Sequence, residues 1–238
     1  MRHPDDSNMG FVDLPVPLSV AFDAKDYPAR LTANRTVSAA LDGFGRGGGV
    51  VGLTFGQFST IDLVSNLLSV VGDGAALGLC TWSCGWIEAL ALGRWVEYGR
   101  VSDLRLLCDQ SMKRGQLPLG ELVTFLGAVE RVRTTRTHAK FAVLSGDGWH
   151  ITVTASMNLN ENVRVEQFEV VDSKVKWEFF TAYLDAIWKH LPPPSEQPQR
   201  RSLPKAILSE EVFKQPDADS KARDFGVRVG RASYGVRK

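Results

Sequence analysis

Cysteine is scarce in this sequence, which has only Cys80, Cys84 and Cys108 among its 238 residues. An odd number without spaced pairs excludes a disulfide framework, and no His or acidic residues stand at metal-ligand spacing around the three thiols. We therefore interpret them as small buried side chains. We also expect a reducing, cytoplasmic environment.

Long apolar runs are missing too. No window approaches the roughly 18 consecutive apolar residues of a membrane-spanning helix. The first ten residues, MRHPDDSNMG, are polar and acidic and lack the apolar stretch of a signal peptide. The composition, 44% hydrophobic and 23% charged, is close to the globular average and excludes wholesale disorder. The length favours one domain with appendages.

Net charge is nearly absent, because 28 basic residues stand against 27 acidic ones. Affinity for nucleic acid or membrane cannot be argued from that balance. Its distribution is uneven: residues 189–238 hold eleven Lys/Arg and six Asp/Glu, a net charge of +5, and the remainder carries −4. Any attraction to a polyanion is therefore expected to be local.

The composition divides the chain into three parts. Residues 1–49 are rich in Pro, Asp and Gly, and they end in GRGGG followed by two valines, not by the Gly-Lys-Ser/Thr of a phosphate loop. We interpret them as an irregular segment with a Gly-rich hinge. Residues 192–238 begin with three prolines and form a Pro/Arg-rich basic tail. The domain between them covers residues 50–191.

Hydrophobic periodicity predicts the elements of this domain. Helices are expected over residues 58–71, 86–100 and 119–126, with a last amphipathic helix that ends near residue 191. Strands are expected over residues 75–81, 103–108, 129–134, 139–144, 150–155 and 167–171. This order predicts an α/β fold with a mixed β-sheet flanked by helices on both faces. No internal repeat is visible, so the chain contains one such unit.

The residues that carry chemistry cluster between positions 137 and 170. His138 and Lys140 stand two apart on a strand, so their side chains are expected on one face. After a hairpin, the next strand ends with Ser156 and Asn158, and Glu169 lies at the end of the following strand. The set suits an anionic phosphoryl group. The lysine balances charge, the neutral groups bind oxygens, and the histidine supplies covalent or acid–base chemistry.

At these residues the sequence resembles the phospholipase D superfamily, whose motif is H-x-K-x4-D-x6-G-S-x-N. His138-Ala139-Lys140 matches the first part, and Ala155-Ser156-Met157-Asn158 matches the last part with Ala in place of Gly. The resemblance extends over roughly residues 55–190. It departs from the motif at Ser145, where the family has Asp, and in a hairpin that is three residues longer than the standard spacing.

The resemblance implies a phospholipase D-like fold with one motif per chain, and a homodimer that brings two motifs into one active site. His138 of one subunit would attack phosphorus, and His138 of the partner subunit would protonate the leaving oxygen. Glu169 sits where the family keeps a carboxylate behind its histidine, and Glu166 is the competing candidate. Neither a metal nor another cofactor is implied, because two Lys140 side chains and neutral donors can stabilise the charge.

Arginines upstream of His138 favour a polynucleotide substrate, DNA or RNA. Arg131 and Arg133 alternate on a predicted strand, and Arg136 lies beside the predicted site, so the three could line up along a phosphate backbone. Edge-strand protection by charge is the alternative interpretation. Trp149, in the hairpin, is a candidate base-stacking residue. Trp82, Trp86 and Trp95 are expected to pack inside, although Trp82 at a strand end could line the cleft.

Two other functions are compatible with the same residues. The departures at Ser145 and Ala155 would suit a catalytically degenerate protein that binds nucleic acid or acts as a scaffold on the same fold. A lipid or small-diester hydrolase is the other alternative. A lipid substrate would favour an exposed amphipathic element, whereas the last helix is predicted to pack on the core.

Overall fold

The computed structural model describes residues 18–23, 32–33, 36–114, 117–160 and 164–194. Within these residues nine strands form one sheet in the order β2-β1-β3-β9-β8-β7-β4-β5-β6. The strands are β1 (Leu18–Asp23), β2 (Thr32–Ala33), β3 (Gly48–Thr54), β4 (Ala75–Thr81), β5 (Val101–Asp109), β6 (Val132–Thr135), β7 (Phe141–Gly146), β8 (Trp149–Ala155) and β9 (Glu166–Asp172).

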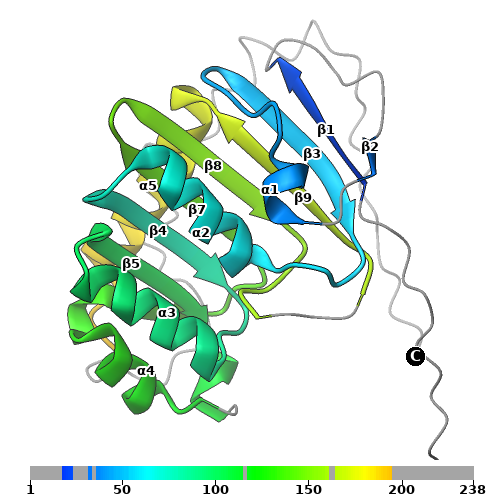
Figure 1. The fold of residues 1–238 in the computed structure, drawn as a ribbon. Helices are drawn as coiled ribbons and strands as arrows, with labels where there is room; N and C mark the ends of the chain where they lie inside the picture. Colours follow the sequence, from blue (N-terminus) through cyan, green and yellow to red (C-terminus); the bar gives the residue numbers. More distant parts are fainter. Residues whose placement is uncertain (1–17, 24–31, 34–35, 115–116, 161–163, 195–238) are drawn as a thin grey trace, which may run out of the picture.

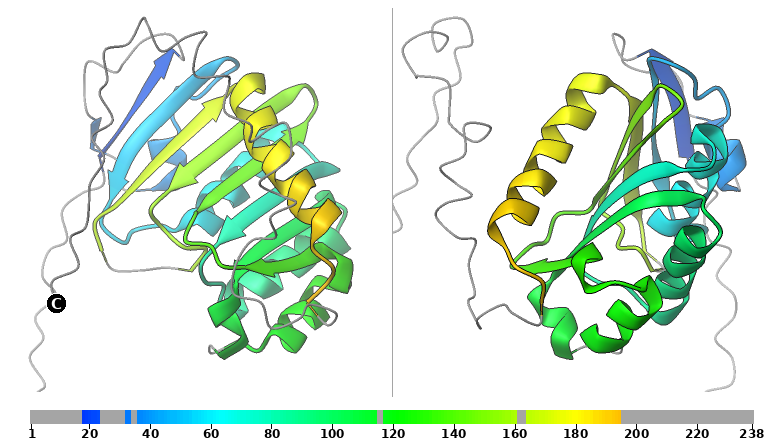
Figure 2. Two further views of the ribbon diagram at one scale, coloured as in Figure 1. Left: turned by 180° about the vertical axis from the view of Figure 1, so that it is seen from behind. Right: turned by 90° about the vertical axis from the view of Figure 1, so that its left-hand side faces the viewer.

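Helices cover both faces of this sheet (Figures 1 and 2). One face carries α1 (Val37–Ala40), α2 (Thr60–Val71), α3 (Trp86–Glu97) and α4 (Leu119–Leu126), and the other face carries α5 (Lys174–His190). Two short 3-10 helices, η1 (Gln110–Arg114) and η2 (Val129–Arg131), flank α4 in the chain. The expected α/β fold with a mixed, doubly covered sheet is confirmed.

Two apolar cores hold the layers together. The larger lies between the sheet and α2–α4 and includes Leu63, Leu67, Leu79 and Leu92, all fully buried. The smaller lies under α5, where Phe141 and Val143 of β7 pack against Leu184 and Ile187. Cys80, Cys84 and Cys108 are buried and free, as expected. Burial raises the pKa of Cys80 to about 12, which suits an inert core thiol.

Strand polarity gives this sheet one edge at which many strand ends meet. β4, β5 and β6 are parallel, and β7, β8, β9 and β3 follow in antiparallel pairs. The C-terminal ends of β3, β4, β5, β6 and β8 therefore lie at the same edge as the N-terminal ends of β7 and β9. Ligands of open α/β sheets commonly bind at the carboxyl ends of the strands.

The structure corrects two sequence-based expectations about elements. Gly48 and Gly49 are not part of a hinge, because they open β3, which pairs with both β1 and β9. The sheet thus extends into the segment that was expected to be irregular. In the expected strand 129–134 the first three residues form η2, and the strand starts only at Val132. The basic tail beyond Pro194 lies outside the described residues.

Local chemistry explains where the helices begin and where the hairpin turns. The backbone N–H of Ser59 donates to the Asp62 carboxylate at 2.8 Å and caps α2, and Gly85 donates to Glu88 at 3.0 Å at the start of α3. Between β7 and β8, Asp147 and Gly148 both have positive φ, 43° and 74°. Two such residues in succession make the tight turn that joins twisted antiparallel strands.

We predict that Gly93 of α3 is required for the close approach of α4. A Cβ at this position would collide with the backbone carbonyl oxygen of Phe125, which cannot move without shifting α4. Gly93→Ala should therefore lower the free energy of unfolding by about 1–3 kcal/mol, although alanine is the better helix former. Urea denaturation measures this. Gly120→Ala in α4 is the matched control, since nothing lies within 4 Å of its added Cβ. Equal stabilities of the two variants would contradict the prediction.

Candidate active site

The candidate site lies at the edge of the sheet where the strand ends meet. His138 and Lys140 directly precede β7, Ser156 and Asn158 directly follow β8, and Glu166 is the first residue of β9. β7, β8 and β9 are neighbours in the sheet, so five residues from three segments of the sequence come to one place. His138, Lys140, Ser156 and Asn158 thus lie at the strand ends where the sequence expected them, whereas Glu169 of the expected set lies further along β9.

His138 and Lys140 contact each other directly. The Lys140 Nζ lies 3.1 Å from Nδ1 and 3.3 Å from Nε2 of His138, and it donates to the His138 carbonyl oxygen at 2.9 Å. The sequence placed this pair within the strand, but both residues lie in the irregular segment just before β7. The backbone is held there because the Ala155 N–H donates to the Lys140 carbonyl at 3.2 Å. His138 is exposed, and Lys140 is half-buried.

Burial and a neighbouring carboxylate act in opposite directions on Lys140. Burial lowers the pKa of Lys140 from its ordinary value of 10.5, and the negative charge of Glu166 offsets part of that fall. The carboxylate thus favours the charged ammonium form. A fixed cation is the feature that an anionic ligand at this edge requires.

Ser156 is held by two neighbours on β9. Its hydroxyl donates to the Glu166 carboxylate and accepts from the Gln167 N–H at 2.9 Å. Asn158 differs, because its Oδ1 atom is buried without a hydrogen-bond partner. Met157, between Ser156 and Asn158, is held by the start of α2, since the Thr60 hydroxyl donates to the Met157 carbonyl at 3.2 Å. An unpaired buried amide oxygen is costly, and because it can only accept, a phosphoryl oxygen does not satisfy it.

The Glu169 carboxylate is engaged elsewhere. It accepts from the Thr154 hydroxyl at 3.1 Å and forms an ion pair with Lys176 of α5 at 2.5 Å. In the described part of the chain these are its side-chain partners, so it is not bonded to His138 in this structure. The competing candidate, Glu166, is the carboxylate that contacts the site.

Sequence reasoning missed Asp109, which lies at the end of β5. It is buried, and its Oδ2 accepts from the backbone N–H of Thr137 at 2.8 Å, while its Oδ1 accepts from Ser111 at the same distance. Burial opposes its charge, but the hydrogen bonds prevail and lower the pKa of Asp109. This carboxylate holds the residue before His138. The signal available in the sequence was an acidic residue directly after an apolar strand.

Trp82 stands beside the histidine. It follows β4, and its ring centroid lies 5.8 Å from that of His138. Among the three tryptophans expected to pack inside, Trp95 is buried, whereas Trp82 is 43% exposed and Trp86 is 46% exposed. Trp82 therefore lies at the strand end beside His138, which is the position that the alternative for this residue expected.

Arg131 and Arg133 do not form the expected stripe. Arg131 lies in η2 and donates to the carbonyl of Leu126, whereas Arg133 is buried under α5. The Arg133 guanidinium donates to the Leu191 carbonyl at 2.7 Å and lies 5.2 Å from the Trp188 ring centroid. Both side chains bind the protein itself. The cause is the 3-10 turn, which breaks the alternation that the sequence suggested.

The other two expected substrate-binding residues differ in exposure, because Arg136 is open to solvent and Trp149 is buried. Arg136 is exposed and lies two residues before His138. Trp149 is buried at the opposite end of β8, where it stacks on Phe44 at 5.8 Å and carries the Arg46 guanidinium 3.9 Å above its ring. A base-stacking role for Trp149 is therefore wrong, because its faces are already covered and it is remote from the site.

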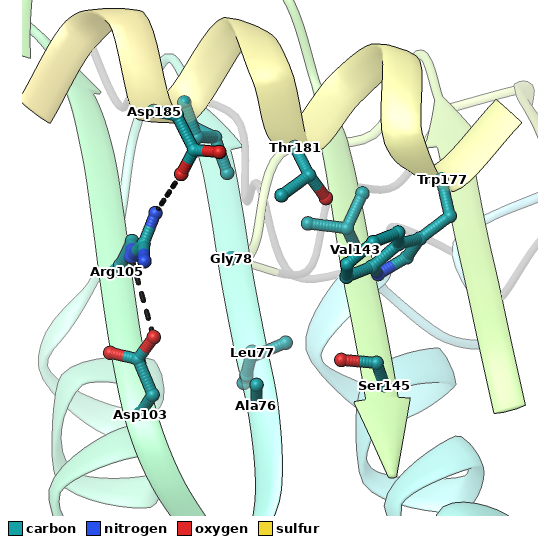
Figure 3. Close-up of a pocket in the computed structure, with 11 residues that line it drawn as sticks. Ala76, Leu77, Gly78, Asp103, Arg105, Val143, Ser145, Trp177, Thr181 and Asp185 are labelled. Atoms are coloured by element: carbon teal, nitrogen blue, oxygen red, sulfur yellow. Dashed lines mark hydrogen bonds and ion pairs between the residues drawn. The ribbon is translucent and has the colours of Figure 1, made fainter. Parts of the chain in front are cut away.

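A separate pocket lies between α5 and the sheet (Figure 3). Its volume is about 230 Å³, and Gly78, Val143 and Trp177 are among its lining residues. The Arg105 guanidinium at its rim is paired with Asp103 at 3.4 Å and with Asp185 at 2.5 Å. This cation is already neutralised, so the pocket offers less to an anionic group than the strand-end site does. None of the site residues expected from the sequence lines it.

No group of three or more His, Cys, Asp or Glu side chains in the described residues is arranged to hold a metal ion. None of the helices there has the length and hydropathy needed to cross a bilayer.

The chain was compared with known proteins at the level of sequence and of structure. No protein-family model matches it, and no curated protein matches its sequence. Among solved structures, it is similar to Nuc from Salmonella typhimurium, a phospholipase D family member, with 15% identity and a TM-score of 0.45 over 65% of this chain and 98% of Nuc.

A second similar structure is the polyphosphate kinase of Porphyromonas gingivalis. The identity is 16% and the TM-score 0.41, over 64% of this chain and 27% of the kinase. At these identities neither similarity assigns an activity or a substrate to this chain.

We predict that Asp109 stabilises the fold in a pH-dependent way. Its pKa is lowered in the folded state, so its contribution is present above the unfolded value of about 3.9 and is lost as the pH falls through the folded value. Asp109→Asn should cost about 1–3 kcal/mol at pH 7, and the difference from wild type should shrink below pH 4. Urea denaturation at pH 7, 5 and 3 measures this.

The matched control for this series is Asp147→Asn. Asp147 is exposed in the β7–β8 turn, and asparagine tolerates its positive φ. A pH-independent loss in Asp109→Asn would show that the charge of Asp109 contributes nothing.

Proposed function

We propose that this protein is a metal-independent phosphodiesterase of phospholipase D type that cleaves DNA or RNA. The observation that carries the proposal is the direct contact between the Lys140 ammonium and the His138 imidazole at an exposed strand edge. Ser156 and Asn158 lie at the end of the neighbouring strand. A nucleophile, a cation and neutral hydrogen-bonding groups in one place suit transfer of an anionic phosphoryl group.

The contact also bears on the state of the histidine. The Lys140 ammonium lies within hydrogen-bond distance of both ring nitrogens, 3.1 Å from Nδ1 and 3.3 Å from Nε2. An ammonium group can only donate, and a neutral imidazole has one accepting nitrogen, so the tautomer decides which of the two accepts. A bound phosphoryl oxygen would compete with the imidazole for the Lys140 ammonium.

The reaction has two balanced steps. The His138 nitrogen bonds to phosphorus as the bond from phosphorus to the leaving oxygen breaks, and His138 of the partner subunit gives a proton to that oxygen. The same histidine of the partner subunit then takes a proton from water. The water oxygen bonds to phosphorus, the phosphorus–nitrogen bond breaks, and both histidines return to their first state.

A homodimer is part of the proposal because the chain holds one motif and the mechanism needs two histidines. A two-fold axis near the exposed His138 would place two identical sites face to face without any further sequence.

A polynucleotide is the proposed substrate on the basis of local charge. Arg136 is exposed beside His138, and residues 189–238 carry a net charge of +5. Arg131 and Arg133 no longer support this choice. The remaining cations still favour a polyanion over a neutral ligand.

The alternative, a degenerate scaffold on the same fold, rested on Ser145 and Ala155. Ser145 is near the far end of β7, where it pairs with His150, and Phe141 at the other end of the strand is the one next to the site. Ala155 packs on the larger core. Neither departure from the motif removes a group from the site, so the enzyme is the better supported function.

We predict that His138→Ala abolishes cleavage of plasmid DNA and of single-stranded oligonucleotides in EDTA. Loss of the nucleophile should lower kcat by at least about 10²-fold. The matched control is His150→Ala, because His150 lies at the far end of β8 and its ring packs on Trp177, 5.1 Å between centroids. An activity that requires a divalent metal, or that survives in His138→Ala, would refute the proposed mechanism.

We predict that Glu166, and not Glu169, sets the protonation of the site. Glu166→Gln removes the charge that raises the pKa of Lys140, so the pKa of Lys140 should fall further. NMR of the Lys140 ε-carbon should therefore show its titration at lower pH than in wild type. Glu169→Gln should leave that titration in place, since this carboxylate binds Thr154 and Lys176. The opposite result would restore the sequence-based choice of Glu169.

A further inference from the structure

An exposed indole next to a candidate nucleophile calls for an explanation. Trp82 is 43% exposed although its side chain is among the most apolar, and its ring lies 5.8 Å from the His138 ring at a tilt of 48°. Leaving apolar area in water forgoes about 25 cal/mol per Å² of stabilisation. Packing in the core therefore does not explain the position of the Trp82 ring. A role in the neighbouring site is the next explanation to consider.

The backbone around Trp82 is anchored on both sides. The buried Thr81 hydroxyl donates to the Ser83 carbonyl at 2.8 Å, and the Ser83 hydroxyl donates to Asn160 Oδ1 at 2.8 Å. Asn160 belongs to the segment after β8 that also carries Asn158. The indole is thus carried on a short segment tied to the same loop as the candidate phosphoryl-binding groups. A platform that is already ordered loses little entropy when a flat ligand lies on it.

We infer that Trp82 stacks on a nucleobase next to the scissile phosphate, so that the substrate is a single-stranded polynucleotide. This rests on the proposed function. In a phosphodiester chain each phosphate is flanked by nucleosides, and the ring beside His138 meets one of their bases. Bases in a duplex are stacked on each other, whereas those of a single strand are free to stack on an aromatic side chain.

A membrane substrate is the competing explanation for exposed apolar side chains near the site. Trp86 and Ile87, in the first turn of α3, are also exposed. However, Trp86 packs edge-to-face on Phe125 of α4 at 5.3 Å, and the first turn of α3 carries no basic residue. A helix that binds anionic lipid presents basic residues beside its apolar ones. The observations favour the base over the lipid.

The test measures cleavage and binding by the full-length protein with four probes. These are a single-stranded oligonucleotide, an abasic strand of the same length, the corresponding duplex, and vesicles of phosphatidylcholine and phosphatidylglycerol. Trp82→Ala should lower kcat/KM on the base-containing strand by roughly 5- to 100-fold. It should have little further effect on the abasic strand, which wild type already cleaves poorly. Trp82→Phe should keep most of the activity, since it keeps a flat ring.

Trp86→Ala is the matched control, because it removes an equally exposed indole that packs on Phe125. It should change kcat/KM on the strand less than twofold. Thermal unfolding of each variant separates loss of the fold from loss of the ring. An equal loss for Trp82→Ala on abasic and base-containing strands would overturn the inference, as would preferred hydrolysis of the vesicles.

Failure of the inference and failure of the proposed function give different results. If wild type cleaves the strand and Trp82→Ala does so equally well, the function stands and the stacking role is wrong. If wild type cleaves none of the four probes but binds the single strand, and Trp82→Ala binds it at least fivefold more weakly by fluorescence anisotropy, stacking stands and the phosphodiesterase is wrong.

Discussion

The contact between Lys140 and His138 depends on the polarity of the strands. The two side chains stand two residues apart in an irregular segment, and they meet only if the backbone between them is held in place. The Ala155 N–H holds it by donating to the Lys140 carbonyl. That bond exists because β7 and β8 are antiparallel neighbours in register. The same arrangement brings the end of β8 beside the start of β9. The sheet edge is therefore the structural basis of the candidate site.

Charge at this edge is balanced among a few coupled groups. Lys140 is less easily charged because it is half-buried, and Glu166 compensates while it also accepts the Ser156 hydroxyl. Asp109 uses its own charge to hold the backbone of Thr137. None of these carboxylates is required to act on the substrate. Their common effect is to keep a histidine, an ammonium and two neutral groups in one geometry.

An exposed aromatic side chain adds an apolar surface to this cationic edge. A cationic centre alone would attract any phosphate, whether free or in a polymer or a lipid. Trp82 adds an apolar plane beside His138, and Arg136 adds an exposed cation two residues before it. A ligand with alternating charge and flat rings would meet both. The pocket under α5 lacks this combination, because Arg105 is neutralised by Asp103 and Asp185.

Local patterns in the sequence predicted most elements between residues 58 and 191 and grouped the main site residues, because period and spacing are local properties. They placed β4 and α4 at their observed bounds, and they indicated that His138, Lys140, Ser156 and Asn158 converge. The sequence patterns did not reveal which carboxylate contacts the site, that Arg133 and Trp149 are buried, or that Asp109 holds Thr137. Such facts depend on which face a side chain takes and on what packs above it. They involve contacts between residues far apart in the chain, which no local pattern specifies.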